Sequence, residues 1–205
     1  MVASYETDRA RLTPEQKAEP DKHINTDPKS ISWTRALKGQ LKNNRTIKVD
    51  SSKLVNALYR PFQRQWLYFS RDLNEVVYQM PKIFPSNDIE NRAISMSGSG
   101  ARSFTTLMVD TLPCLDTVEK GQYFPLKLYE PASADDSLFA TGETGYSERD
   151  GISDAGLKHF QDSYPDKQIS KDDLFYYIYG LLHSPDYRSR FKNNLSKELP
   201  RIPAV

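Results

Sequence analysis

The feature that most constrains the fold is a strand-rich stretch between two helix-rich ends. Short aromatic and β-branched runs recur between Gln65 and Tyr129, and turn-forming residues separate them. The runs are residues 65–70, 75–80, 93–97, 104–109, 111–115 and 123–129. No helical pattern separates them, so the crossover helices that parallel pairing needs are missing. We predict an α+β fold with a mainly antiparallel sheet, flanked by N-terminal and C-terminal helices.

The flanking helices are predicted from apolar spacing and capping residues. Towards the N-terminus we expect helices at residues 31–41 and 53–59, the second ended by Pro61. Towards the C-terminus we expect three helices: residues 153–164, one after Ser170 as N-cap, and one that starts at Pro185. Two segments are predicted without regular structure: a polar lead-in at residues 1–30 and a loop at residues 131–151.

The total charge identifies no partner, but its distribution along the chain is uneven. The formal net charge is +1. Between Ser30 and Arg64 the only acid is Asp50, against the basic residues Arg35, Lys38, Lys42, Arg45, Lys48, Lys53, Arg60 and Arg64. A neutral total can therefore hide a basic face that meets phosphates. Solvated helix faces produce the same pattern, so both interpretations stay open.

Motifs of the common catalytic sites are missing from the sequence. It has no G-x-x-x-x-G-K-[ST] phosphate loop, no G-x-G-x-x-G fingerprint and no G-x-S-x-G elbow. The three histidines are scattered, and Cys114 is the only cysteine. We therefore predict no catalytic residue, no metal ligand and no cofactor, and hence no enzyme activity of this chain alone. No apolar run reaches the roughly 18 residues of a membrane span, and a cytoplasmic location is the default expectation.

Six segments in a fixed order point to a family. Residues 59–68 read Tyr-Arg-Pro-Phe-Gln-Arg-Gln-Trp-Leu-Tyr, and the chain ends in Pro-Arg-Ile-Pro at 200–203. The other segments are residues 27–35 with an Ile-x-Trp motif, 74–85 together with 90–100, 122–126 and 173–188. This series resembles the C-terminal specificity region of type ISP restriction–modification enzymes. These are single chains that combine a nuclease, a helicase and an N6-adenine methyltransferase.

The resemblance implies a DNA target-recognition domain at residues 27–205. Residues 1–26 would be a linker or the trailing edge of a methyltransferase domain. The N-P-P-Y/F segment that grips a flipped adenine is absent, as are the S-adenosylmethionine loop and the helicase motifs. Such a domain would position the target for N6-adenine methylation and restriction without catalysing either. Its partners would be double-stranded DNA and the methyltransferase domain of the same parent polypeptide, with no membrane involved.

The loop at residues 97–103 is the first candidate for reading bases. Its glycines allow the backbone to approach DNA closely, and Arg102 can form two hydrogen bonds with guanine. Hydroxyl groups come from Ser97, Ser99 and Ser103. Candidates for phosphate contacts are Lys42, Arg45, Arg60, Arg64 and Lys82.

Other roles for these residues remain open. The loop can be a plain hairpin connection with polar residues in solvent. Arg60 and Arg64 can instead pack around Phe62 and Trp66, or dock to a methyltransferase domain. The whole chain can also be a protein-interaction module without DNA contact, or a small catalytic fragment.

Overall fold

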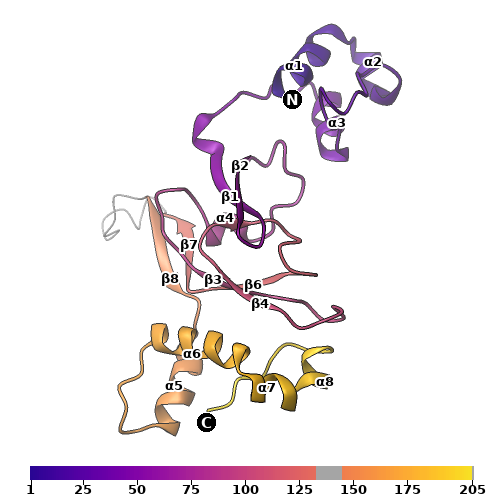
Figure 1. The fold of residues 1–205 in the computed structure, drawn as a ribbon. Helices are drawn as coiled ribbons and strands as arrows, with labels where there is room; N and C mark the ends of the chain where they lie inside the picture. The colour runs from indigo at the N-terminus through magenta and orange to yellow at the C-terminus, as the bar shows by residue number, and fades with distance from the viewer. Residues whose placement is uncertain (133–144, 205) are drawn as a thin grey trace. The chain divides into compact units, whose positions relative to one another are not determined.

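The protein forms two compact units. The structure is a computed structural model that describes residues 1–132 and 145–204 (Figure 1). The N-terminal unit consists of Met1–Val55 and Leu67–Tyr78. The C-terminal unit consists of Asn56–Trp66 and Gln79–Val205. Helices lie towards both ends of the chain and mainly antiparallel strands lie between them, so the predicted α+β class is confirmed.

The N-terminal unit is helical from its first residues, contrary to the predicted polar lead-in. Its helices are α1 (Val2–Arg11), α2 (Pro14–Ala18), η1 (Pro20–Lys22), α3 (Arg35–Lys42) and η2 (Ser51–Lys53). Sparse apolar residues are enough because they share one core, made of Tyr5, Leu12, Ile24, Ile31, Leu37, Leu41 and Ile47. The Tyr5 hydroxyl is fully buried and donates a hydrogen bond of 2.6 Å to the Arg45 carbonyl. Residues on both sides of position 26 belong to this core, and the division at that position stays a prediction.

A β-hairpin replaces the helix predicted at residues 53–59. Its strands are β1 (Leu54–Arg60) and β2 (Gln63–Tyr68), and Pro61 and Phe62 form the turn. The prediction was wrong because Pro61 was interpreted as the end of a helix, whereas proline also favours the second position of a β-turn. Strand pairing then satisfies the backbone: β1 lies between β2 and β5 (Leu112–Pro113), to which it is parallel.

The second sheet lies in the C-terminal unit and is antiparallel, as predicted. Its order is β4 (Thr106–Val109), β3 (Ala93–Met96) and β6 (Gln122–Pro125). Ser95 of β3 lies opposite Leu107 on one side and Tyr123 on the other. The predicted single sheet is thus divided into smaller ones. The strand predicted at 75–80 is not formed, because residues 75–79 are irregular with a turn at 78–79 and Met80 begins the short helix α4 (Met80–Ile83).

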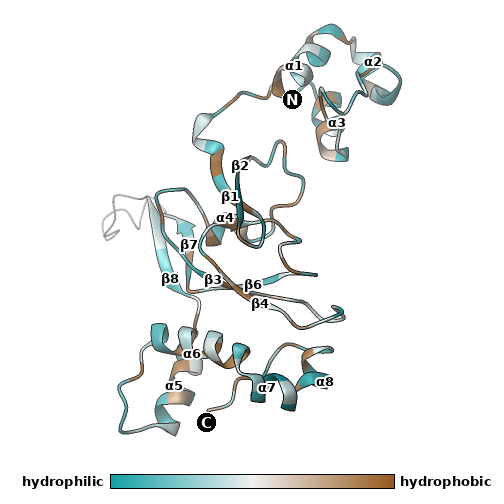
Figure 2. Ribbon diagram, in the orientation of Figure 1, coloured by the Kyte–Doolittle hydropathy of each residue, from teal (hydrophilic) through white to brown (hydrophobic). Residues whose placement is uncertain are grey.

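Four helices follow the sheet region among residues 145–204, and α6 (Lys171–His183) packs against the sheet. The others are α5 (Asp154–Ser163), α7 (Pro185–Arg190) and α8 (Lys192–Leu195). Ile94 of the sheet shares a buried cluster with Phe175 and Leu182 of α6, in line with the hydrophobic residues along these elements in Figure 2. The predicted N-cap at Ser170 is confirmed and forms a capping box with Asp173.

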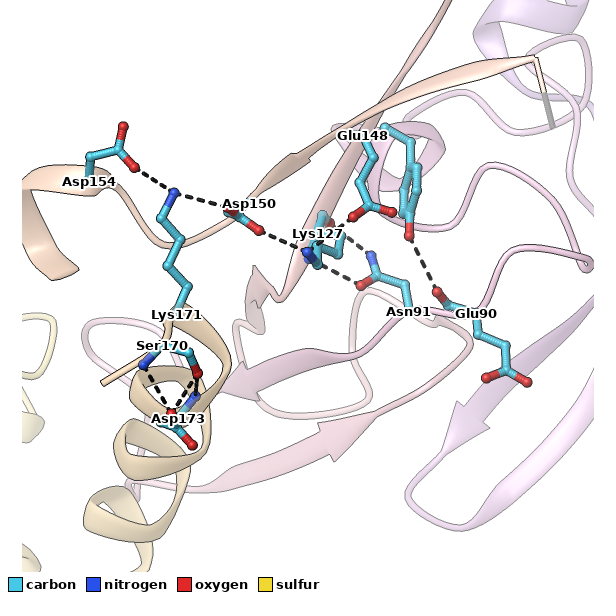
Figure 3. A network of polar contacts seen from close by, with 10 residues as sticks. Glu90, Asn91, Lys127, Glu148, Asp150, Asp154, Ser170, Lys171 and Asp173 are labelled. Atoms are coloured by element: carbon cyan, nitrogen blue, oxygen red, sulfur yellow. Dashed lines mark hydrogen bonds and ion pairs between the residues drawn. The ribbon is translucent and has the colours of Figure 1, made fainter. Parts of the chain in front are cut away.

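An antiparallel ribbon and a charged network connect the sheet region to α6. The ribbon pairs β7 (Lys127–Pro131) with β8 (Tyr146–Asp150), so a strand occupies the end of the predicted loop at 131–151. Residues 133–144 of that loop lie outside the described residues. Asp150 accepts hydrogen bonds from Lys127 (2.8 Å) and Lys171 (2.9 Å), as Figure 3 shows. These two ammonium groups lower the pKa of Asp150.

Asn91 ties α4 to the ribbon. Its side-chain amide donates hydrogen bonds of 2.8 Å to the carbonyls of Ile83 and Lys127, and its oxygen accepts one from the Lys127 N–H. Asn91 is buried, so water cannot easily replace its side chain as the hydrogen-bond partner of these backbone groups.

We predict that Asn91→Ala lowers the free energy of unfolding by roughly 3 kcal/mol, because buried backbone groups lose their partners. The exposed Asn193→Ala is the matched control and should change stability by less than about 0.5 kcal/mol. Urea unfolding of both variants measures the difference. Equal midpoints would show that Asn91 contributes nothing to the fold.

Candidate nucleic-acid interface

The loop between β3 and β4 is closed at its base by Ser97. The Ser97 N–H donates to the Thr105 carbonyl, and the Ser97 hydroxyl accepts a hydrogen bond of 2.9 Å from the Thr105 N–H. Ser97 is only 4% exposed. Its predicted contact with DNA is therefore replaced by an internal role, because burial and pairing keep this hydroxyl from the surface.

Residues 114–121 support the loop from one side. The Gly98 N–H donates to the Glu119 carbonyl (3.3 Å), and Lys120 Nζ donates to the Gly100 carbonyl (2.8 Å). A Cβ atom on Gly98 would lie 2.5 Å from the Lys120 carbonyl oxygen, a separation that no ordinary contact allows. Gly100 has a φ of +73°, in the left-handed region that glycine adopts at no steric cost. The two loops thus interlock through their backbones.

The segment after α8 supports the loop from a second direction. The Gly100 N–H donates to the Ser196 carbonyl (3.2 Å), and the Ser99 hydroxyl donates to the Lys197 carbonyl (2.7 Å). The Ser99 oxygen can still accept a hydrogen bond from a ligand. Supports from residues far away in the sequence therefore hold the tip of the loop, which the alternative of a plain hairpin connection does not require.

Arg102 is the most accessible charged group of this loop. Its side chain is 92% exposed and meets Glu119 only through Nε, at 3.4 Å from Oε1. The Arg102 N–H also donates to Glu119 Oε2 (3.0 Å). These contacts lower the pKa of the Glu119 carboxyl, with the backbone N–H of Arg102 as the largest cause. Ser103 beside it is exposed as well.

The two hairpin arginines are exposed, so they do not pack in a core. Arg64 Nη2 lies 2.7 and 2.8 Å from the two carboxylate oxygens of Asp110. Arg60 donates to the Tyr59 carbonyl, and its guanidinium lies 4.2 Å from the centre of the Tyr59 ring. Both guanidinium groups remain at the surface.

The other predicted phosphate contacts are scattered. Lys82 of α4 forms an ion pair with Glu130 (2.8 Å). In the N-terminal unit, Arg45 meets Asp72 (3.4 Å) and Lys42 is exposed. Lys42 and Arg45 thus belong to a different unit from the loop.

Residues 110–121 of the C-terminal unit contact both the hairpin and the loop. Near the hairpin, the Cys114 N–H donates to the Leu58 carbonyl (2.8 Å), and the Thr117 hydroxyl donates to the same oxygen (3.3 Å). Further along, Glu119 and Lys120 hold the loop. We refer to the hairpin tip 59–66, the connecting segment 110–121 and the loop 97–105 as the recognition edge.

Three residues of the recognition edge are not among the candidate contacts predicted from the sequence: Phe62, Glu119 and Lys120. Glu119 and Lys120 belong to no recognisable sequence motif. They support the loop through contacts with residues about 20 positions earlier in the sequence. Phe62 was detectable, since Pro-Phe between two strand-forming runs is a turn signal.

The described residues contain no group of three His, Cys, Asp or Glu side chains placed to hold a metal ion. Within the same residues, no helix is both long and apolar enough to cross a membrane.

Comparison with known proteins identifies related chains. The family model for the Type ISP C-terminal specificity domain matches residues 1–205. No curated protein matches. A cryo-EM structure of a DrdV–DNA complex is 35% identical with a TM-score of 0.84, and the match covers 100% of this chain and 18% of that chain.

Two further solved structures are similar. The ATP-dependent Type ISP restriction-modification enzyme LlaBIII bound to DNA is 27% identical with a TM-score of 0.79, covering 98% of this chain and 12% of that one. A nuclease-deletion mutant of the Type ISP enzyme LlaGI in complex with a DNA substrate mimic is 30% identical with a TM-score of 0.77, covering 99% and 14%. The chain therefore spans less than a fifth of each of these relatives.

We predict that Gly98→Ala lowers the free energy of unfolding by roughly 1–3 kcal/mol, because the new methyl group would collide with the Lys120 carbonyl. Gly180→Ala in α6 is the matched control. It meets no atom within 4 Å and should raise stability by about 0.5–1 kcal/mol through helix propensity. Thermal unfolding compares the two, and a Gly98 variant as stable as the Gly180 variant would contradict the interlocked loops.

Proposed function

Because the chain belongs to the Type ISP C-terminal specificity domain family, we propose that it recognises the DNA target of a restriction–modification enzyme. In this proposal the chain binds double-stranded DNA and positions the target for N6-adenine methylation and restriction. Both reactions occur in other domains of the parent polypeptide, and the methyltransferase domain is its second partner. The relatives whose structures contain DNA support this assignment.

One observation carries the proposal: an exposed arginine on a loop that is held from two sides. A loop that is already ordered loses little conformational entropy on binding, so more of its contact energy appears as affinity. Arg102 is exposed, and its fork of donors matches the O6 and N7 acceptors of guanine in the major groove. The supports of Gly98, Ser99 and Gly100 hold the arginine at a constant position.

Glu119 gives Arg102 a partner that DNA can replace. The contact is a single exposed ion pair, and such pairs contribute little to stability. Exchange of Glu119 for a base or a phosphate therefore costs little. In the free protein the carboxylate limits the directions in which the guanidinium can point, and it opposes non-specific binding by adding a negative charge beside Arg102.

Selection from a pool of random duplexes identifies the preferred site, and the salt dependence of binding then tests the function. Neutralised phosphates release counterions, so the affinity of a DNA-binding chain should fall steeply with salt concentration. A docking module without DNA contact would select no sequence and show no such dependence. That result would favour the protein-interaction alternative.

For Arg102→Ala we predict a loss of about 1–3 kcal/mol on the selected site together with relaxed specificity at one base pair. If Arg102 contacts only a phosphate, all sequences should weaken evenly and the salt slope should fall by about one. Arg149→Ala, an exposed arginine of β8, is the matched control and should change neither quantity. If Arg102→Ala has the same affinity, specificity and salt slope as this control, the loop does not contact DNA.

A further inference from the structure

The turn of the β1–β2 hairpin holds a phenylalanine in a conformation that phenylalanine rarely adopts. Phe62 has a φ of +65° and follows Pro61, whose ring presets the position before it. Turns of this type usually have glycine or asparagine at the position of Phe62, because a bulky side chain is strained in the left-handed region. The sequence therefore maintains a large side chain where a small residue would suit the backbone better.

Packing within the chain does not explain this side chain. Phe62 is 89% exposed, and Trp66 on the neighbouring strand is 66% exposed. Tyr59 is also exposed and carries the Arg60 guanidinium over its ring. An exposed aromatic group at a strained position stabilises nothing in the free protein, which points to a contact with a partner.

The charge around the tip indicates the kind of partner. Residues 59–66 contain Arg60 and Arg64 and no acidic residue. Arg64 is neutralised by Asp110, whereas the contacts of Arg60 are with a carbonyl, a ring and the sulfur of Cys114. Arg60 thus remains a net positive charge beside the exposed rings. Aromatic groups beside an uncompensated arginine suit a nucleic acid, which offers bases for stacking and phosphates for pairing.

The position of the hairpin within the recognition edge supports the same partner. The connecting segment 110–121 contacts β1 at Leu58 and the base-reading loop at Gly98 and Gly100. The two elements share one support and belong to the same compact unit, so one duplex bound along the recognition edge can meet both.

We propose that the hairpin tip is a second DNA contact of this chain, in which Phe62 stacks on bases as an apolar wedge and Arg60 binds a neighbouring phosphate. The inference rests on the proposed DNA recognition. Insertion of an aromatic ring at a base step costs unstacking energy, and the new stacking and phosphate contacts offset this cost. At the turn of Pro61 and Phe62 the ring is 89% exposed and therefore accessible to a base.

The Phe62→Gly variant distinguishes a role of the ring in DNA binding from a role in the stability of the fold. Glycine adopts a φ of +65° without strain, so this variant should unfold at the same temperature as the unaltered chain or at a higher one. The same variant should bind the selected duplex about 5- to 100-fold more weakly, since a stacked ring is lost. Phe62→Trp preserves a ring and should keep the affinity within about threefold. Arg60→Gln should weaken binding to all duplexes and reduce the salt slope by about one.

Fluorescence of 2-aminopurine, placed in turn at each position of the selected duplex, tests the wedge directly. The unaltered chain should raise the fluorescence at one base step, and Phe62→Gly should abolish this increase while Phe62→Trp does not. If Phe62→Gly binds as tightly as the unaltered chain and gives the same fluorescence, the wedge is wrong but DNA recognition is not affected. The hairpin tip would then contact a protein such as the methyltransferase domain. An unaltered chain without salt-dependent binding to any duplex overturns the proposed function and the wedge together.

Discussion

The recognition edge depends on hydrogen bonds to backbone groups that are distant in the sequence. The loop at 97–105 has few side chains with which to build a core, yet the carbonyls of Glu119, Ser196 and Lys197 and the ammonium of Lys120 hold its tip. Two glycines make this possible, one by leaving space for a carbonyl and one by its left-handed backbone. Without this network the backbone of Arg102 would sample more positions, which would weaken the selection of one base edge that we propose for its donors.

The organisation of the C-terminal unit also depends on contacts between elements that are distant in the sequence. The β4–β3–β6 sheet is covered by α6 and the following helices, so strands and helix share the cluster around Ile94 and Phe175. The last helices also deliver Ser196 and Lys197 to the loop. In the proposed function this arrangement would allow side chains of the loop to change while the backbone supports remain.

Local chemistry decided which elements could be predicted from the sequence. The C-terminal helices were predictable because Ser153, Ser170 and Ser184 are N-caps with clear partners, and the loop before β4 was marked by its glycines. Residues 1–30 and the strand β1 were not, because a small shared core and a pairing with β5 decide their structure. Burial of Ser97 and the role of Lys120 likewise depend on tertiary contacts, which no motif encodes.

If DNA binds along the recognition edge, hydrogen–deuterium exchange of the 205-residue chain with and without its selected duplex should reveal the contact. On binding, we expect slower exchange at residues 97–105 and 59–66, with little change in α5. Protection confined to other segments, with both parts of the recognition edge unchanged, would contradict binding along this edge.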